Sequence, residues 1–167
     1  MDLSSIHIER WGSSGPRVVL VHGGAQGTET GGERNFAFQR PLAEQGWQLI
    51  VPDRPGHGRS PDPGRPDDAE ADGAWVAELL GDGAHLLGHS YGGVIALCAA
   101  GLRPEAELCR LDWSAIDLDE RLIDITASKN SASHRFVKVS DNLVAWLRPL
   151  ALDSGAVSTR GGILTRK

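Results

Sequence analysis

The sequence has little of what secreted, metal-binding or membrane-spanning proteins depend on. Only two of its 167 residues are cysteines, too few for a disulfide framework and without the paired spacing of a zinc site. It has no apolar run long enough to cross a bilayer, and its first residues lack the basic and apolar regions of a signal peptide. We therefore predict a cytoplasmic protein with no metal, no cofactor and no membrane partner.

Positive charge is also scarce. The formal net charge is −5, so a nucleic-acid partner is not predicted. The glycines do not have the G-x-G-x-x-G spacing of a dinucleotide-binding turn, and there is no phosphate-binding loop of the Walker type. Hydrophobic residues make up 40% of the chain, which is ordinary for a globular protein and sufficient for one domain with a core.

Apolar segments alternate with helix-like segments over the first hundred residues. Strand character is found at residues 6–11, 17–22, 48–51 and 84–87, and helix character at residues 36–45, 67–80 and 94–102. Strands that alternate with helices pair in parallel. The predicted fold class is therefore α/β, with a mostly parallel sheet that carries helices on both faces.

The composition changes near residue 105. All three lysines and only one of nine prolines lie beyond it. The first 105 residues carry eight basic and fourteen acidic side chains, and the remainder carries nine and eight, so the formal charges are −6 and +1. We divide the chain into a domain at 1–105, a segment of uncertain order at 106–152 and a disordered tail at 153–167.

The most informative motif is Gly88-His89-Ser90-Tyr91-Gly92, which follows a short apolar run and precedes a helical stripe. This G-x-S-x-G pattern is typical of a nucleophile elbow, a strained strand-to-helix turn that exposes a serine hydroxyl. Small residues are needed on both sides of the serine because strand and helix pack closely at the bend. The motif predicts Ser90 as the nucleophile of an acyl-transfer reaction.

A second motif, His22-Gly23-Gly24, follows a strand that is apolar throughout. Such a turn can place a backbone amide opposite the serine, where negative charge develops on the substrate carbonyl oxygen. We assign the two oxyanion donors to the amides of Gly24 and Tyr91. The imidazole of His22 is interpreted as ordering the turn, and positions 22, 23 and 89 are assigned to the substrate-binding surface.

A third motif runs from Asp53 to Ser60 with the sequence DRPGHGRS. By itself it indicates a tight loop, and His57 is interpreted as ordering that loop. The three motifs in this order resemble those of the α/β-hydrolase fold superfamily, and most of all its small bacterial serine esterases and related hydrolases. The resemblance covers about residues 5–105. It implies a small-molecule acyl substrate and Ser90 as nucleophile, without choosing among ester, amide or thioester bonds.

The resemblance also implies a triad in the order serine, acid, histidine. Only one histidine follows Ser90, namely His134, at the start of a possible strand over 134–139. Asp112 is the first choice for the acid, because residues 108–111 could form the strand after the elbow helix, and Asp124 is the second. Residues 106–167 are too few for a lid and the remaining elements, so the fold is predicted to be truncated after this helix.

Three interpretations remain open. The chain is a compact serine hydrolase whose base is His134 or another, unexpected group; or it is the amino-terminal half of a hydrolase joined to an unrelated or frame-shifted tail; or it is a non-catalytic domain that binds a ligand or partner on the same scaffold. The sequence gives neither the substrate nor the oligomeric state.

Overall fold

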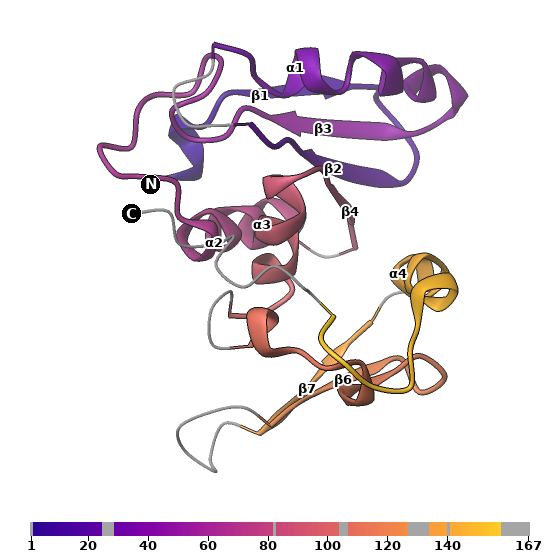
Figure 1. Ribbon diagram of the computed structural model, residues 1–167. Helices are drawn as coiled ribbons and strands as arrows, with labels where there is room; N and C mark the ends of the chain where they lie inside the picture. The colour runs from indigo at the N-terminus through magenta and orange to yellow at the C-terminus, as the bar shows by residue number, and fades with distance from the viewer. Residues whose placement is uncertain are drawn as a thin grey trace. The chain divides into compact units, whose positions relative to one another are not determined.

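The computed structural model describes residues 2–24, 29–81, 83–103, 107–126, 134–139 and 141–157. The chain divides into two compact units, a first unit at Met1–Ala100 and a second unit at Gly101–Lys167 (Figure 1). Each has its own sheet, and each is described by itself below.

The first unit is built on a four-stranded sheet. Its strands are β1 (Ile8–Trp11), β2 (Arg17–Val21), β3 (Gln48–Pro52) and β4 (His85–Gly88), in the spatial order β1-β3-β2-β4. Strand β2 is parallel to both β3 and β4, whereas β1 is antiparallel to β3. The sheet is thus mostly parallel, as the sequence predicted, and among the described strands β4 pairs with β2 alone.

Both faces of this sheet are covered, which explains why its central strands are apolar throughout. On one face Val19, Val21 and Ile50 pack against helices α2 (Ala69–Leu80) and α3 (Tyr91–Ala99). On the other, Leu20 and Leu49 share a cluster with Phe36, which lies between the short helix α1 (Gly32–Asn35) and the 3-10 helix η2 (Ala37–Gln45). The predicted arrangement of helices on both faces is confirmed (Figure 1).

Helix α2 begins where the sequence places an acidic pair. The side chain of Asp68 accepts hydrogen bonds from the amides of Glu70 and Ala71, each at 3.0 Å, and so caps the helix. Gly81 ends the helix with a positive φ of 50°. The neighbouring Asp67 does not cap; its carboxylate turns toward a buried arginine described below.

The second unit has a smaller, antiparallel sheet. It contains β5 (Ile116–Asp117), β6 (Leu122–Ile125) and β7 (Arg135–Lys138), followed by helix α4 (Asp141–Leu147). The strand expected at residues 108–111 is not formed. This segment is largely the 3-10 helix η3 (Leu108–Arg110), so the expectation of a strand at these residues is wrong.

Part of the predicted disordered tail is ordered. The amide of Trp113 donates to the carbonyl of Gly155 at 2.8 Å, and the amide of Val157 donates to the carbonyl of Leu111 at 2.9 Å. The prediction of disorder is therefore wrong for residues 153–157, which gain backbone partners that no local pattern reveals. Residues 158–167 lie outside the described part of the chain.

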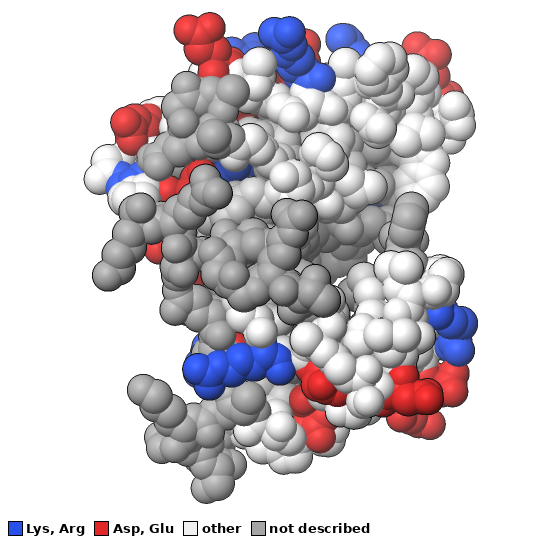
Figure 2. Space-filling view, viewed as in Figure 1, with Lys and Arg blue, Asp and Glu red and all other residues white. Residues whose placement is uncertain are grey.

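Charged side chains of both signs occur on the face that Figure 2 shows, in keeping with the small net charge. In the part of the chain that the structure describes, no helix is both long and apolar enough to cross a membrane.

Candidate active site

The turn between β4 and α3 holds Ser90 in a strained conformation. Its φ of 58° and ψ of −125° lie outside the regions that side-chain-bearing residues favour. Ser90 is exposed, and Tyr91 begins the helix immediately after it. Conformations of this kind cost about 1–3 kcal/mol and persist only where the surrounding packing imposes them.

The flanking glycines show how the packing imposes this conformation. A Cβ atom on Gly92 would lie 2.1 Å from the carbonyl oxygen of Val21, and one on Gly88 would lie 2.2 Å from the carbonyl oxygen of Gly92. The obstacles are backbone atoms, which cannot move aside as a flexible side chain can. The turn is therefore packed tightly against β2. Only glycine fits at these two positions, as the sequence analysis expected from the close packing of strand and helix.

The loop after β2 lies directly against the serine. A Cβ atom on Gly23 would lie 2.6 Å from the Cβ of Ser90 and 3.0 Å from its Oγ. Tyr91 is the first residue of α3, so its amide has no partner within the helix. Among hydrogen bonds between described residues, neither this amide nor that of Gly24 is a donor. The structure thus brings Gly23 against Ser90.

The side chain of His22 is buried and holds this loop through both ring nitrogens. It is fully buried; Nδ1 lies 2.7 Å from the carbonyl oxygen of Gly23, and Nε2 lies 2.9 Å from the amide of Arg54. Because the Arg54 amide can only donate, Nε2 accepts and Nδ1 carries the proton. Burial lowers the pKa of His22 to about 4. The assignment of its side chain to the substrate-binding surface is therefore corrected to loop ordering, the role the sequence analysis gave to its imidazole.

The DRPGHGRS segment is held by its own buried polar groups. The Asp53 carboxylate accepts hydrogen bonds from the amides of Gly32 at 2.6 Å and Arg59 at 2.9 Å. The hydroxyl of Ser60 donates to the Asp53 carbonyl at 2.6 Å. His57 is 1% exposed, with Nδ1 3.0 Å from the carbonyl of Pro55, which fits the predicted loop-ordering role.

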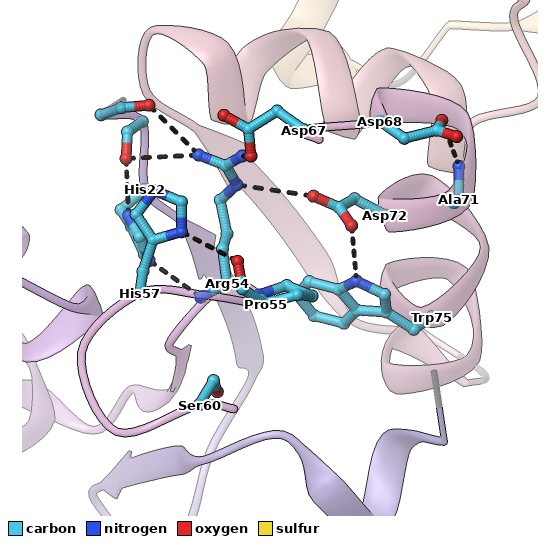
Figure 3. A network of polar contacts seen from close by, with 12 residues as sticks. His22, Arg54, Pro55, His57, Ser60, Asp67, Asp68, Ala71, Asp72 and Trp75 are labelled. Atoms are coloured by element: carbon cyan, nitrogen blue, oxygen red, sulfur yellow. Dashed lines mark hydrogen bonds and ion pairs between the residues drawn. The ribbon is translucent and has the colours of Figure 1, made fainter. Parts of the chain in front are cut away.

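Arg54 is the residue whose importance the sequence analysis missed. Its side chain is fully buried and forms an ion pair with Asp67, and its Nε lies 3.6 Å from Asp72 (Figure 3). The guanidinium lies over the Tyr91 ring, 4.6 Å from its centroid. The sequence did contain a signal for this role: an arginine follows a buried strand, and two aspartates stand at the start of the next helix.

The predicted base and acid belong to the second unit. His134 Nε2 lies 2.6 Å from the Asp124 carboxylate, and both side chains are substantially exposed. Asp112 is engaged elsewhere: it accepts from the Ser114 amide at 2.9 Å, the Ser114 hydroxyl at 2.7 Å and the Gly155 amide at 3.1 Å. The hydrogen bonds from Ser114 hold the pKa of Asp112 below its usual value. The structure thus pairs His134 with Asp124, the second choice for the acid, and not with Asp112.

His89 lies within the turn itself. Its backbone amide donates to the Val21 carbonyl at 2.9 Å. Its side chain is exposed, and the residue directly precedes Ser90 in the sequence. Its assignment to substrate binding stays a prediction. Among the described residues, no group of three or more histidine, cysteine or acidic side chains is arranged to hold a metal ion.

Comparison with known proteins connects these features to one family. The model of a family described as alpha/beta hydrolase fold matches residues 16–106, the stretch that contains the loop after β2, the DRPGHGRS segment and the Ser90 turn. An esterase from a marine microorganism has a similar structure, with a TM-score of 0.50 and 22% identity over 58% of this chain and 37% of its own. At this identity the similarity shows the fold alone.

Two curated relatives are named for different activities. Lipase LipV of Mycobacterium tuberculosis is 38% identical over 122 residues, which cover 68% of this chain and 43% of the lipase. The dihydrolipoyllysine-residue acetyltransferase component of an acetoin cleaving system from Pseudomonas putida is 36% identical over 105 residues, covering 58% of this chain and 27% of that protein. The chain thus spans less than half the length of either relative.

Proposed function

We propose, on the premise that this chain belongs to the alpha/beta hydrolase fold family, that Ser90 is the nucleophile of a serine hydrolase that cleaves a carboxylic ester. The observation that carries the proposal is an exposed serine at a φ of 58°, wedged between β4 and α3 and lying against Gly23. In this proposal the turn is a nucleophile elbow and the loop after β2 forms half of an oxyanion hole.

The proposed chemistry proceeds in two steps. The Oγ of Ser90 forms a bond to the substrate carbonyl carbon, its proton passes to a base, and the alcohol leaves with that proton to give an acyl-enzyme. Water then attacks the acyl-enzyme and releases the acid. The amides of Gly24 and Tyr91 donate to the carbonyl oxygen as it becomes negative, and each donor of this kind lowers the barrier by about 3 kcal/mol.

The proposed base is His134, oriented by Asp124. A carboxylate 2.6 Å from Nε2 stabilises the protonated imidazole, so Nδ1 would be the nitrogen that accepts a proton. Asp124 replaces Asp112 in this role because the Asp112 carboxylate already accepts from Ser114 and Gly155.

Labelling with a fluorophosphonate probe tests the proposal, because such probes react only with activated serines. We expect labelling of the wild-type protein, none in Ser90→Ala, and a decrease of at least about 1,000-fold in His134→Ala, since triad members act as a unit. Asp124→Asn should slow labelling and Asp112→Asn, its matched control, should not. An unlabelled wild-type protein would contradict the proposal, and equal effects of the two aspartate variants would contradict the choice of acid.

A second candidate is a domain that binds an acyl compound without cleaving it. The observation that favours it is that His134 lies outside residues 16–106, the part that the family model matches. In this case short p-nitrophenyl esters would shift the amide resonances of Gly24 and Tyr91 but would not be hydrolysed faster by the wild-type protein than by Ser90→Ala.

A further inference from the structure

Arg54 is unusual because its guanidinium, which is always charged, has no exposed surface. Burying such a group costs several kcal/mol unless ion pairs and hydrogen bonds compensate. The arginine sits in the loop after β3, one residue beyond Asp53, so its own backbone is fixed by the contacts of the DRPGHGRS segment.

One side of the guanidinium is anchored on helix α2 and the turn before it. Asp67 forms an ion pair with Nη2, and the Asp72 carboxylate lies 3.6 Å from Nε. Asp72 is itself 1% exposed and accepts from Arg65 at 2.8 Å and from the indole of Trp75 at 3.4 Å. The two carboxylates therefore balance the charges of the two arginines and hold Arg54 in one orientation (Figure 3).

The other side of the guanidinium faces the loop beside Ser90. Its Nη1 lies 3.5 Å from the carbonyl oxygen of Gly23 and 3.4 Å from that of Gly24. The Gly23 carbonyl also accepts from His22 Nδ1 at 2.7 Å, and the Arg54 amide donates to His22 Nε2. Arg54 thus contacts the Gly23 carbonyl directly through its side chain. Its backbone amide also acts on this carbonyl indirectly, because it holds the His22 ring that donates to the carbonyl.

The direction of the Gly24 amide follows from this anchoring. The Gly23 carbonyl and the Gly24 N–H belong to one trans peptide, in which the two groups point in opposite directions. Donors on the buried side that hold the carbonyl therefore turn the N–H away from the buried network. The same guanidinium stacks over Tyr91, whose amide is the other proposed donor.

We infer that Arg54 is a positioning residue for the oxyanion hole: it fixes the Gly23–Gly24 peptide so that the Gly24 amide faces the reacting carbonyl oxygen. This inference rests on the proposed function, since it assumes Gly24 as an oxyanion donor. Lysine cannot replace the arginine, because one ammonium group lacks the planar fork that reaches the carboxylates, the loop carbonyls and the aromatic ring together.

The test compares Arg54→Lys with Arg59→Lys. Arg59 lies in the same loop, but its side chain is half exposed and pairs with Glu33 at the surface. We expect Arg54→Lys to slow fluorophosphonate labelling of Ser90 by about 10- to 100-fold, less than the loss of a whole donor. In turnover of p-nitrophenyl butyrate, kcat should fall while KM stays within twofold, because the donor acts on the transition state. Arg59→Lys should match wild type in both assays.

Nitrogen–proton correlation spectra give a readout that does not need activity. In folded Arg54→Lys, the amide resonance of Gly24 should shift or broaden, and in Arg59→Lys it should not. An unchanged Gly24 resonance in folded Arg54→Lys overturns the inference, as does an altered resonance with unchanged kcat in an active enzyme. If wild type fails to label, the nucleophile proposal fails, and the Gly24 resonance alone then decides whether Arg54 holds the loop.

Discussion

The two units differ in how many polar side chains they bury. The first unit buries a set of them, all 2% exposed or less: His22, Asp53, Arg54, His57 and Asp72. Among the described residues of the second unit, Glu107 is equally buried and pairs with Arg135. The pairs Arg121–Asp141, His134–Asp124 and Arg148–Asp119 there involve side chains that are between 39% and 85% exposed. A buried polar group must be satisfied in one geometry, whereas an exposed pair exchanges its partner for water at little cost. The comparison teaches that loop geometry is fixed far more firmly in the first unit.

The largest effect is expected at the turn that holds Ser90. In Gly92→Ala, the added methyl group meets the Val21 carbonyl at 2.1 Å, so we expect the free energy of unfolding to fall by about 4 kcal/mol. In Gly93→Ala the nearest backbone atom is 3.6 Å away, and a better helix former should raise stability by up to about 1 kcal/mol. Urea unfolding followed by circular dichroism measures both, and equal midpoints would refute the close packing at Gly92.

The next effect is a dependence of stability on pH that comes from the buried His22 of the first unit. The unfolded chain binds a proton on His22 as the pH falls below 6.5, but the folded protein does so only near its lowered pKa of about 4. The free energy of unfolding should therefore decrease by about 3 kcal/mol as the pH falls from 6.5 to 4, and His22 should contribute no change above that range.

His22→Gln and the exposed His134→Gln are compared with wild type in urea titrations over this pH range. We expect the free energy of unfolding to depend less on pH in His22→Gln than in wild type. In His134→Gln the dependence on pH should match that of wild type. Parallel slopes in wild type and His22→Gln would show that the buried imidazole does not carry the effect.

A matched pair of aspartates sharpens the comparison further. Asp53 and Asp112 each accept hydrogen bonds from two backbone amides, but Asp53 is 2% exposed whereas Asp112 is half-buried. Replacement of Asp53 by alanine leaves buried donors without a partner and should cost about 2 kcal/mol, against about 0.5–1 kcal/mol for Asp112→Ala. Hydrogen exchange resolved by peptide mass reports each unit separately. Equal losses of protection from exchange in Asp53→Ala and Asp112→Ala would show that burial does not distinguish the two aspartates.

The smallest effect is expected at the exposed pair of the second unit. Asp124→Asn should lower the free energy of unfolding by no more than about 0.5 kcal/mol, because an exposed pair gains little over hydrated charges. Asp119→Asn, which removes the charge from the exposed pair with Arg148, should lower the free energy of unfolding by a similarly small amount. A loss comparable to that of Asp53→Ala would show that His134 and Asp124 are held more firmly than their exposure indicates.

The sequence predicted the first unit well because its central strands are buried on both faces. Residues 17–22, 48–51 and 84–87 were predicted as strands, and β2, β3 and β4 lie within a residue of these limits. Strand β6 was not predicted, because at four residues Leu122–Ile125 is too short to show a clear alternation of buried and exposed residues. Pairing of residues 111–113 with 155–157 depends on contacts across more than forty residues, which no local pattern encodes.

The features of the candidate site also fall into those that a local sequence pattern predicts and those that depend on contacts between distant segments. The strained turn at Ser90 follows from a local pattern of glycines, and the side-chain role of His57 follows from its position in a tight loop. The contacts of Arg54 with Asp67, Asp72 and Gly23 could not be predicted, because only the folded chain brings those segments together. The pairing of His134 with Asp124 likewise depends on the register between β6 and β7.

The closeness of Gly23 to Ser90 limits how this chain can evolve. Any side chain at position 23 would begin 2.6 Å from the Cβ of Ser90 and 3.0 Å from its Oγ, so it would collide with the serine itself. Neighbouring surface positions can diversify and alter what is recognised, but this one admits a single amino acid. If codon 23 were randomised and variants were selected for reaction at Ser90, we expect every survivor to encode glycine.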